Sequence, residues 1–484
     1  TYWSPISQKV SDTTKNYNEL ACYIELEKRT GIHINFQHPP FGQEKEQFNL
    51  MMASNDYPDL IWYTWTDIPG GPAKAVNDKA IIKLNDAIDK YAPNLKKAFG
   101  KYPDSRKDSM LDDGTFYMFP FMKPDKAVRT VYGPQFRKDW LDKLQMKVPV
   151  TIDEMYEVLK AFKEKDPNGN GQKDEIPFVS QKLNEIKYLS AAWGLDYGIY
   201  IGKNTIKYGP IEPAYRNYLS TMRQWYKEGL IDPDFLTNDA KQFDAKITGN
   251  KAGAFFGLAS GNMGRYMNLM LEKDPKYELV GAPWAIGPGG NSYNTHTDAV
   301  RPITGPGLAI TTKNKYIPES VKWCDYQYSD EGSLLMNFGI EGESYKMVNG
   351  YPTYTDLILK NPKGLTPDQA VARYATTFGA TMIYDSRYIE QIMALPQQKA
   401  AMKTWAQGDT SLTLTTITPT SEESSKLASI MNSVNTYRDE MFGKFVLGQE
   451  PMENYDKFVQ TIKNMKIDDA LKAYQAALDR YNNR

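Results

Sequence analysis

Residues 20–65, LACYIELEKRTGIHINFQHPPFGQEKEQFNLMMASNDYPDLIWYTW, alternate between helix patterns and strand patterns. An amphipathic helix pattern ends at Gly31, and an alternating strand pattern follows in residues 31–37. A second helix is expected in residues 45–56 and a further strand in residues 59–65. Strand–helix–strand order at this spacing predicts an α/β fold with a mostly parallel sheet covered by helices.

The rest of the chain continues as ordered α/β sequence. Thr151 and Glu154 form a capping-box pattern that predicts the start of a helix. Residues 451–484 have a helical pattern, and no internal repeat or low-complexity linker interrupts the chain. A length of 484 residues exceeds what one compact core usually holds, so two lobes joined by several crossings are expected.

Composition argues against several classes of function. The 58 basic and 59 acidic residues give a net charge of −1, without the basic excess that phosphate binding requires, so no nucleic-acid partner is expected. The 3 histidines and 2 cysteines form no zinc or redox motif. His296 lies in a polar loop and is expected to be solvated. No apolar run approaches the roughly 18 residues needed to span a bilayer.

Aromatic residues are abundant in polar stretches of the chain. The sequence holds 33 Tyr, 19 Phe and 9 Trp, several of them in residues 61–71 and 281–290, which are rich in Gly and Pro. Flat rings beside hydrogen-bonding groups suit the apolar faces and hydroxyls of sugars. The alternative is that these rings are core residues, because large proteins bury many aromatics.

The sharpest chemical motif is residues 166–175, DPNGNGQKDE. Oxygen-bearing side chains fall at loop positions 1, 3, 5 and 9, with Gly171 at position 6, as in the first half of an EF-hand loop. Position 12 is Pro177, so the usual bidentate glutamate is missing and Glu175 is its expected substitute. The alternative is an Asx/Gly turn that binds nothing. Crowding of three carboxylates favours a structural Ca²⁺.

Several segments together resemble the extracellular solute-binding protein family 1 of ABC sugar importers. The similarity is strongest to the large calcium-containing branch, which includes alginate-oligosaccharide binders and lipoproteins of the LplA type. The matching segments occur in the family's order: LMMASNDYPDLI (50–61), LNDAIDKYAPNL (84–95), DDGTFYMFP (112–120), residues 136–177, residues 320–345 and residues 444–482.

The resemblance implies a two-lobed Venus-flytrap fold with a ligand cleft between the lobes. It implies an N-lobe of residues 1–122 and 301–335 and a C-lobe of residues 123–300 and 336–484. Hinge crossings are expected in three segments of the chain: residues 112–123, 284–302 and 336–345. The family's calcium ligands carry over onto six positions: Asp166, Asn168, Asn170, Gln172, Asp174 and Glu175.

The implied function is that of a binding protein and not of an enzyme. It would capture an oligosaccharide between its lobes and deliver it to the permease subunits of an ABC importer. The ligand-contact candidates are aromatic platforms and polar groups beside the cleft loops or crossings: Trp62, Tyr63, Trp65, Asp67, Trp193, Trp284, Arg301 and Glu343. Trp193 is equally compatible with a buried helix end, and Arg301 with a surface ion pair.

Two other function classes stay open at this point. One is a carbohydrate-active enzyme, a glycoside hydrolase or lyase, which would need a pair of carboxylates about 5–10 Å apart. The other is a binding protein for a peptide or another non-sugar solute. The resemblance further implies a monomer that is lipid-anchored on the extracellular face of a Gram-positive membrane, or periplasmic. A lipobox leader is expected before Thr1, and Cys22 is not the expected lipid site.

Overall fold

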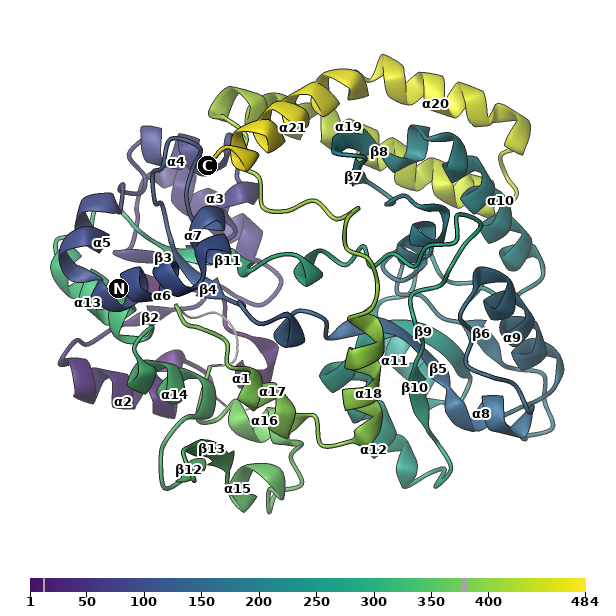
Figure 1. The fold of residues 1–484 in the computed structure, drawn as a ribbon, viewed down its shortest axis with the longest axis horizontal. Coiled ribbons are helices and arrows are strands. Elements are labelled where there is room, and N and C mark those ends of the chain that lie inside the picture. Colours follow the sequence, from purple (N-terminus) through teal and green to yellow (C-terminus); the bar gives the residue numbers. More distant parts are fainter. Residues whose placement is uncertain (12–13, 377–380) are drawn as a thin grey trace.

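The computed structural model describes residues 1–11, 14–376 and 381–484 as a mixed α/β protein with two lobes side by side (Figure 1). The strands have these bounds: β1 Tyr2–Trp3, β2 Phe36–Gln37, β3 Leu60–Tyr63, β4 Phe119–Met122, β5 Tyr132–Arg137, β6 Ile176–Phe178, β7 Ile199–Gly202, β8 Thr205–Tyr208, β9 Ala252–Leu258, β10 Leu279–Gly281, β11 Ile303–Ile310, β12 Tyr345–Val348 and β13 Tyr351–Tyr354.

The first helices have these bounds: α1 Gln8–Ser11, α2 Ala21–Thr30, α3 Glu44–Ser54, α4 Gly71–Asn77, α5 Asn85–Tyr91, α6 Pro93–Lys101, α7 Pro103–Asp108, α8 Lys138–Lys143, α9 Ile152–Glu164, α10 Pro213–Lys227 and α11 Ala240–Thr248. The later helices follow: α12 Arg265–Leu271, α13 Ile317–Tyr326, α14 Asp330–Phe338, α15 Asp356–Leu359, α16 Pro367–Val371, α17 Ser386–Ile392, α18 Pro396–Trp405, α19 Ser421–Val446, α20 Tyr455–Asn464 and α21 Ile467–Asn482.

The N-lobe is built on a five-stranded sheet in the order β2-β1-β3-β11-β4. β1 pairs in parallel with both β2 and β3, which confirms the parallel sheet expected from the first part of the sequence. β11 returns much later in the chain and runs antiparallel to β3 and β4. Its pairing brings Gly307 of β11 opposite Tyr63, the last residue of β3.

The C-lobe is built on a four-stranded sheet in the order β10-β5-β9-β6. β5 is antiparallel to both neighbours, and β6 is parallel to β9. The predicted capping box is present at the start of α9, where the Thr151 hydroxyl accepts the Glu154 N–H. The apolar face of α9, including Phe162, is buried against this sheet, so the loop after α9 starts from a fixed position.

The chain crosses between the two sheets twice: the second crossing overlaps the predicted residues 284–302, whereas the first begins only at the end of the predicted residues 112–123, most of which lie in the N-lobe core. It leaves β4 and reaches β5 through a short 3-10 helix at Lys126–Val128, and it returns from β10 to β11 through residues 282–302. α14 packs against α2 and β13, whereas Phe338 at the end of α14 and Tyr354 of β13 share an apolar cluster with Phe255 and Leu279 of the C-lobe sheet, so the third crossing at residues 336–345 stays a prediction. The residue boundaries of the two lobes stay a prediction.

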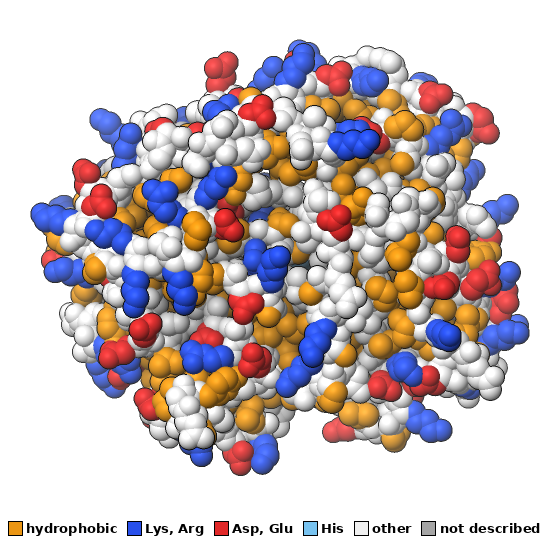
Figure 2. All heavy atoms as spheres, in the orientation of Figure 1, with side chains coloured by type: hydrophobic (Ala, Val, Ile, Leu, Met, Phe, Trp, Pro, Cys, Tyr) orange, Lys and Arg blue, Asp and Glu red, His pale blue; other side chains and the backbone are white. Residues whose placement is uncertain are grey.

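The helices α19, α20 and α21 form an arch along one side of both lobes (Figure 1). Their apolar faces belong to the C-lobe core, where Phe442 and Phe458 share a cluster with Tyr218 and Trp225 of α10. Among the described residues, no helix combines the length and the apolar character that crossing a membrane requires. Basic and acidic side chains are interspersed over the face seen in Figure 2.

Candidate ligand cleft and calcium loop

Arg301 lies at the end of the second crossing, immediately before β11. The residue is half-buried, and its Nε is fully buried without a hydrogen-bond partner among the described residues. A buried donor that binds neither protein nor water costs about 1–3 kcal/mol. The guanidinium of Arg301 is therefore available to donate to a group that enters the space between the lobes.

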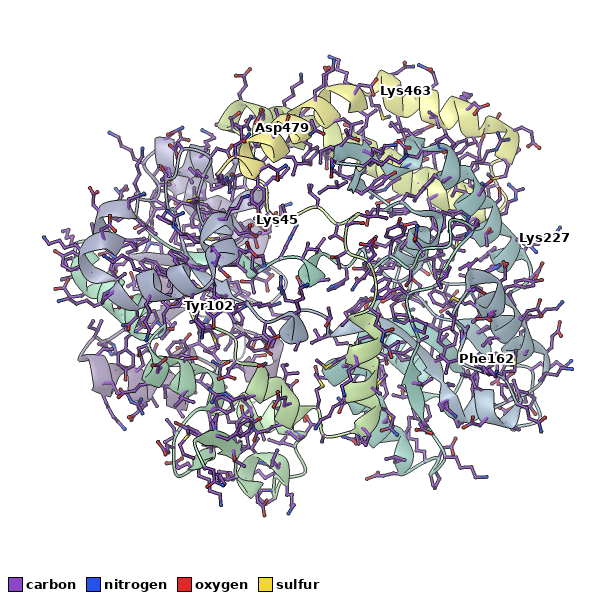
Figure 3. All side chains as sticks on the ribbon, in the orientation of Figure 1. Lys45, Tyr102, Phe162, Lys227, Lys463 and Asp479 are labelled. Atoms are coloured by element: carbon purple, nitrogen blue, oxygen red, sulfur yellow. The ribbon has the colours of Figure 1, made fainter. Side chains whose placement is uncertain are left out.

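Acidic side chains from the N-lobe surround Arg301. Burial raises the pKa of Asp67, and the charges of Arg301 and Lys45 oppose this rise. Burial also raises the pKa of Asp108 to about 6, against the hydrogen bond from Tyr481 and, more weakly, the positive charges of Arg484 and Arg301. Lys45, at the start of α3, extends toward the space between the lobes in Figure 3. The N-lobe wall of this space therefore carries both donors and acceptors.

The two crossings are joined to each other by polar contacts. Lys123 of the first crossing lies with its Nζ 3.2 Å from Asp298 Oδ2 of the second. The Arg129 guanidinium donates to the Val300 carbonyl oxygen at 3.3 Å, and the Lys123 N–H donates to the Pro302 carbonyl oxygen at 2.7 Å. These bonds hold the two crossings together close to Arg301 in the sequence.

His296 is not solvated as the sequence predicts. Its ring stacks on Tyr132 with the centroids 4.6 Å apart, and it also lies near Tyr188, because the crossing folds back against β5. Burial lowers the pKa of His296 to about 4, so its imidazole is neutral at physiological pH. The C-lobe side of the crossing thus presents an aromatic surface of Tyr132, Tyr188 and His296, which the sequence did not indicate.

Glu185 is a buried carboxylate close to this aromatic surface. Burial raises the pKa of Glu185 to about 7, although it accepts hydrogen bonds from the Ser180 hydroxyl at 3.0 Å and from the Gln181 N–H. Its folded pKa is therefore higher than the ordinary value of 4.5. The folded protein binds the proton more tightly than the unfolded chain does, so stability from this group is complete below pH 4.5 and is lost as the pH rises through 7.

Replacing Glu185→Gln is expected to raise the stability at pH 8 by about 2 kcal/mol and to change it little at pH 4, because the amide keeps an acceptor and carries no charge. Chemical denaturation at both pH values measures this difference. Glu157→Gln, at an exposed position of α9, is the control and should show no pH-dependent gain. A Glu185→Gln effect of equal size at both pH values would contradict the account.

The aromatic platform expected after β3 is mostly buried. Trp62 is 3% exposed and Trp65 is 0% exposed, and the Trp65 Nε1 donates to the Gly307 carbonyl oxygen at 3.1 Å. Both rings belong to the N-lobe core, and β11, which pairs beside β3 in the sheet, supplies the Gly307 carbonyl that Trp65 bonds. Tyr63 is half-buried and stacks on Phe48 of α3 at 3.5 Å. Of the three predicted platform rings, Tyr63 is the one that keeps an accessible part.

The remaining predicted contacts are scattered. Trp284 is 2% exposed in the C-lobe core, beside a cavity of about 20 Å³ that has room for no more than a water molecule. Trp193 is half-buried and packs on Tyr218. Glu343 is exposed in the turn that leads to β12. The structure therefore brings together Tyr63, Asp67 and Arg301. It places Trp193, Trp284 and Glu343 elsewhere.

The predicted calcium loop is a tight turn between α9 and β6. Asp166, Gly169 and Gly171 have φ values of 47°, 73° and 76°, a region that glycine adopts readily. The Asp166 carboxylate accepts the N–H groups of Gly169 and Gly171, each at 3.0 Å. The Asn170 side-chain oxygen accepts the Gln172 N–H at 2.7 Å. The side chains at loop positions 1 and 5 thus hold the loop in a tight turn through bonds to its own backbone.

The end of the loop carries a buried carboxylate, that of Glu175. Glu175 is 7% exposed, and both of its carboxylate oxygens are buried without a hydrogen-bond partner among the described residues. Burial raises its pKa, and the negative charges of Asp166 and Asp174 raise it further. A buried carboxylate in this state is stabilised by a cation. The donor set of the loop therefore fits Ca²⁺.

The carboxylates are not gathered around one point in this structure. Among the described residues, no group of three or more acidic, histidine or cysteine side chains lies close enough to hold a metal ion. Instead, Lys251 Nζ lies 2.9 Å from Asp174 Oδ2, and the amides of Asn168 and Asn170 donate to Asp174 Oδ1. In this arrangement, the Lys251 ammonium and the two side-chain amides are the groups that stabilise the Asp174 carboxylate.

Two α/β lobes, with polar side chains at the crossings between them, define the class of two-lobed solute-binding proteins. A crystal structure of the alginate-binding protein AlgQ2 without calcium ion superposes with a TM-score of 0.79 at 26% identity, covering 95% of this chain and 94% of AlgQ2. A structure of the EF-hand mutant of S. pneumoniae FusA in complex with fructo-nystose has a TM-score of 0.78 at 24% identity, covering 100% of this chain and 99% of FusA.

The chain belongs to the bacterial extracellular solute-binding protein family, whose sequence profile matches residues 11–333. The fructooligosaccharide ABC transporter substrate-binding protein FusA of Streptococcus pneumoniae serotype 4 (strain ATCC BAA-334 / TIGR4) is 31% identical over 344 residues. This match covers 68% of the present chain and 61% of that relative. The chain is a bacterial extracellular solute-binding protein by family, and this family and its relatives are substrate-binding proteins and not enzymes.

Proposed function

We propose that this protein captures an oligosaccharide between its two lobes and delivers it to the permease subunits of an ABC importer. The observation that carries the proposal is Arg301, a cation at the interlobe crossing whose Nε is buried without a partner. Tyr63 and Asp67 lie on the N-lobe side, and a sugar offers the hydroxyls and the apolar face that suit them. Tyr132 and Tyr188 provide the matching aromatic surface of the C-lobe.

Binding in such a cleft works by differential affinity for two lobe arrangements. A sugar that contacts both lobes stabilises the closed arrangement, which a permease can distinguish from the open one. Each sugar hydroxyl that is buried without a partner costs about 1–3 kcal/mol, so the polar groups around Arg301 select among sugars. The single half-buried ring of Tyr63 gives one stacking position on the N-lobe side.

Neutral oligosaccharides are expected to bind more tightly than uronic ones. Asp67, Asp108 and Asp298 already lie within electrostatic reach of Arg301, so a uronate would meet negative charge beside the guanidinium. The similar proteins differ on this point, because FusA is named for a neutral sugar and AlgQ2 for alginate, which is uronic.

A thermal-shift panel tests the proposed function. Neutral fructans and glucans and uronic oligosaccharides are each added at millimolar concentration with calcium present, and a ligand at 100 times its Kd adds about 2.7 kcal/mol. We expect a shift of several degrees for a neutral sugar and a smaller one for uronic sugars. A shift for peptides and for no sugar in the panel would overturn the proposal, and a preference for uronic sugars would overturn the assignment of charge.

The calcium loop completes the proposal as a structural site. We propose that Asp166, Asn168, Asn170, Asp174 and Glu175 hold Ca²⁺ by their side chains and Gln172 by its carbonyl oxygen. The bound ion would neutralise Glu175 and fix the connection between α9 and β6. The loop follows the far end of α9, whose other face packs in the C-lobe core, so the ion supports that lobe and takes no part in a reaction.

The cellular location follows from the family. We propose that the protein works as a monomer outside the cell membrane, held by a lipid anchor or free in a periplasm. A lipid anchor would keep the binding protein near its permease and raise its effective concentration there. Fractionation of cells that produce the protein from its own gene, with detection in the membrane pellet before and after lipase treatment, distinguishes the two arrangements.

A further inference from the structure

The end of α21 contacts the N-lobe although its helix belongs to the C-lobe. Ala477, Leu478 and Tyr481 of α21 pack with Ile206 of β8, so the helix is fixed to the C-lobe. Residues 107–112, which its last turn contacts, belong to the N-lobe, where Met110 and Leu111 are core side chains. The contact therefore joins the two lobes by non-covalent interactions, in addition to the chain crossings.

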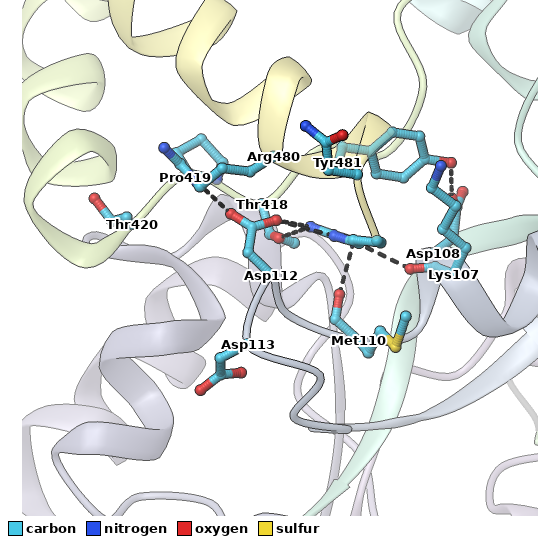
Figure 4. Close-up of polar contacts among 12 residues, drawn as sticks. Lys107, Asp108, Met110, Asp112, Asp113, Thr418, Pro419, Thr420, Arg480 and Tyr481 are labelled. Atoms are coloured by element: carbon cyan, nitrogen blue, oxygen red, sulfur yellow. Dashed lines mark hydrogen bonds and ion pairs between the residues drawn. The ribbon is translucent and has the colours of Figure 1, made fainter.

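Two arginines carry this connection, which we call the C-terminal clamp (Arg480, Tyr481 and Arg484 of the C-lobe with residues 107–112 of the N-lobe). Arg480 Nε donates to Asp112 Oδ2 at 2.6 Å (Figure 4). Arg480 Nη1 also donates to Glu423 Oε1 of α19 at 3.0 Å. Arg484 Nη2 donates to Asp112 Oδ1 at 2.6 Å. Asp112 is thus shared by two guanidinium groups from one helix end.

Backbone and aromatic contacts extend the clamp. Arg484 Nη1 donates to the carbonyl oxygens of Lys107 and Met110 at 3.0 and 2.8 Å, and the Arg484 side chain is 1% exposed. The Tyr481 hydroxyl donates to Asp108 Oδ1 at 2.5 Å, with Lys107 Nζ 4.3 Å from the centre of the Tyr481 ring (Figure 4). A buried guanidinium with several fixed acceptors is far more persistent than an exposed ion pair.

A second contact joins the arch to the N-lobe close by. A Cβ placed on Gly71 of α4 would lie 2.9 Å from Ser424 Oγ and 3.6 Å from Ser424 Cβ of α19. The two helices therefore approach each other as closely as glycine permits. Both contacts lie along the same arch, and both join the N-lobe to elements fixed in the C-lobe core.

From these contacts we infer that the C-terminal clamp is a pivot that stays bonded whether or not the cleft holds a ligand. With the clamp and the chain crossings fixed, the lobes are confined to rotation about the line that joins them. Arg480 and Arg484 are then positioning residues, which act on the ligand by holding the cleft walls in register. The alternative is a latch that breaks on every closure. The buried, shared bonds of Arg484 and Asp112 oppose that behaviour.

A distance measurement without ligand tests the pivot independently of the proposed function. Spin labels are placed at Lys97→Cys of α6 and Lys227→Cys of α10, both exposed, while the native Cys22 and Cys324 are buried. We expect one narrow interlobe distance distribution, at least doubled in width by Arg480→Ala with Arg484→Ala. Asp112→Asn is the milder second variant, and Arg265→Ala, which breaks an ion pair inside the C-lobe, is the control. Equal widths in all four proteins would overturn the inference.

A cross-link then separates a pivot from a latch. Gly71→Cys with Ser424→Cys places the two Cβ atoms at a separation that a disulfide spans, although φ of 65° at residue 71 makes a side chain there strained. This arm rests on the proposed sugar binding. Oxidised protein is expected to bind the best panel sugar within about threefold of the same protein reduced, whereas a latch predicts at least a tenfold loss on oxidation. A failure of both forms to bind sugar would contradict the proposed function and leave the distance measurement as the test of the pivot.

Discussion

Removal of calcium is expected to lower the melting temperature of the protein by roughly 5–15 °C. An ion present at 100 to 1,000 times its Kd stabilises the folded state by about 3–4 kcal/mol, and each kcal/mol moves the midpoint by about 2–4 °C for a lobe of this size. The physical cause is Glu175, whose buried carboxylate has no partner among the described residues. Differential scanning calorimetry in calcium and in a chelator measures the shift, and added Ca²⁺ should restore the midpoint.

Glu175→Gln is expected to change the stability of the protein differently in calcium and in chelator. In calcium the variant should be less stable than the wild type, because the ion loses a charged ligand. In chelator it should be at least as stable, because the buried negative charge is gone. Glu164→Gln, at an exposed position near the end of α9, is the control and should follow the wild type in both conditions. Identical melting temperatures of the wild type with and without calcium would contradict the assignment of a calcium site.

Arg301→Met is expected to weaken oligosaccharide binding about 100-fold, because hydrogen bonds to a charged group contribute roughly 1.5–3 kcal/mol each. The free protein should keep its melting temperature, since the Nε of Arg301 has no hydrogen-bond partner among the described residues. Titration calorimetry with the sugar that gives the largest thermal shift measures the loss.

Two further variants define how Arg301 acts. Arg301→Lys keeps the charge but lacks the planar donor fork, so an intermediate loss of affinity is expected. Arg265→Met removes an arginine that pairs with Asp244 on the C-lobe surface and should bind sugar like the wild type. Binding by Arg301→Met within threefold of the wild type would place the ligand elsewhere in the cleft.

Local sequence patterns predicted the parts of the molecule that local interactions build. The capping box at Thr151 and the turn at Asp166 depend on residues within a few positions of each other, and both are present. The parallel pairing of β1, β2 and β3 also follows from strands that are close in the sequence. These features could be predicted because their partners stand beside them in the chain.

Burial of the aromatic residues could not be predicted in the same way. Trp65 becomes a core residue because Gly307, far along the chain, supplies the carbonyl that its Nε1 bonds. A ring in a polar, glycine-containing stretch looks accessible until its partners far along the chain are placed. The position of Lys45 beside the space between the lobes could not be predicted from the sequence, because a lysine in the first turn of a helix carries no signal of a binding site.

The C-terminal clamp could not be predicted from the sequence either, because its residues lie far apart in the chain. Asp108 and Tyr481 are separated by 373 positions, and the shared acceptor Asp112 lies within a segment that the sequence associates with a hinge crossing. The resemblance to a known family predicted the two-lobed fold from segments spread along the chain. It did not indicate which charged residues meet between the lobes, since that depends on how the arch of α19 to α21 is seated.

Small-angle X-ray scattering of the intact protein with calcium, before and after saturation with the best panel sugar, tests the central claim most directly. Capture between two lobes predicts a decrease in the radius of gyration that follows the binding isotherm and is absent in Arg301→Met at the same sugar concentration. A saturated protein whose scattering does not change would contradict capture by closure of the lobes.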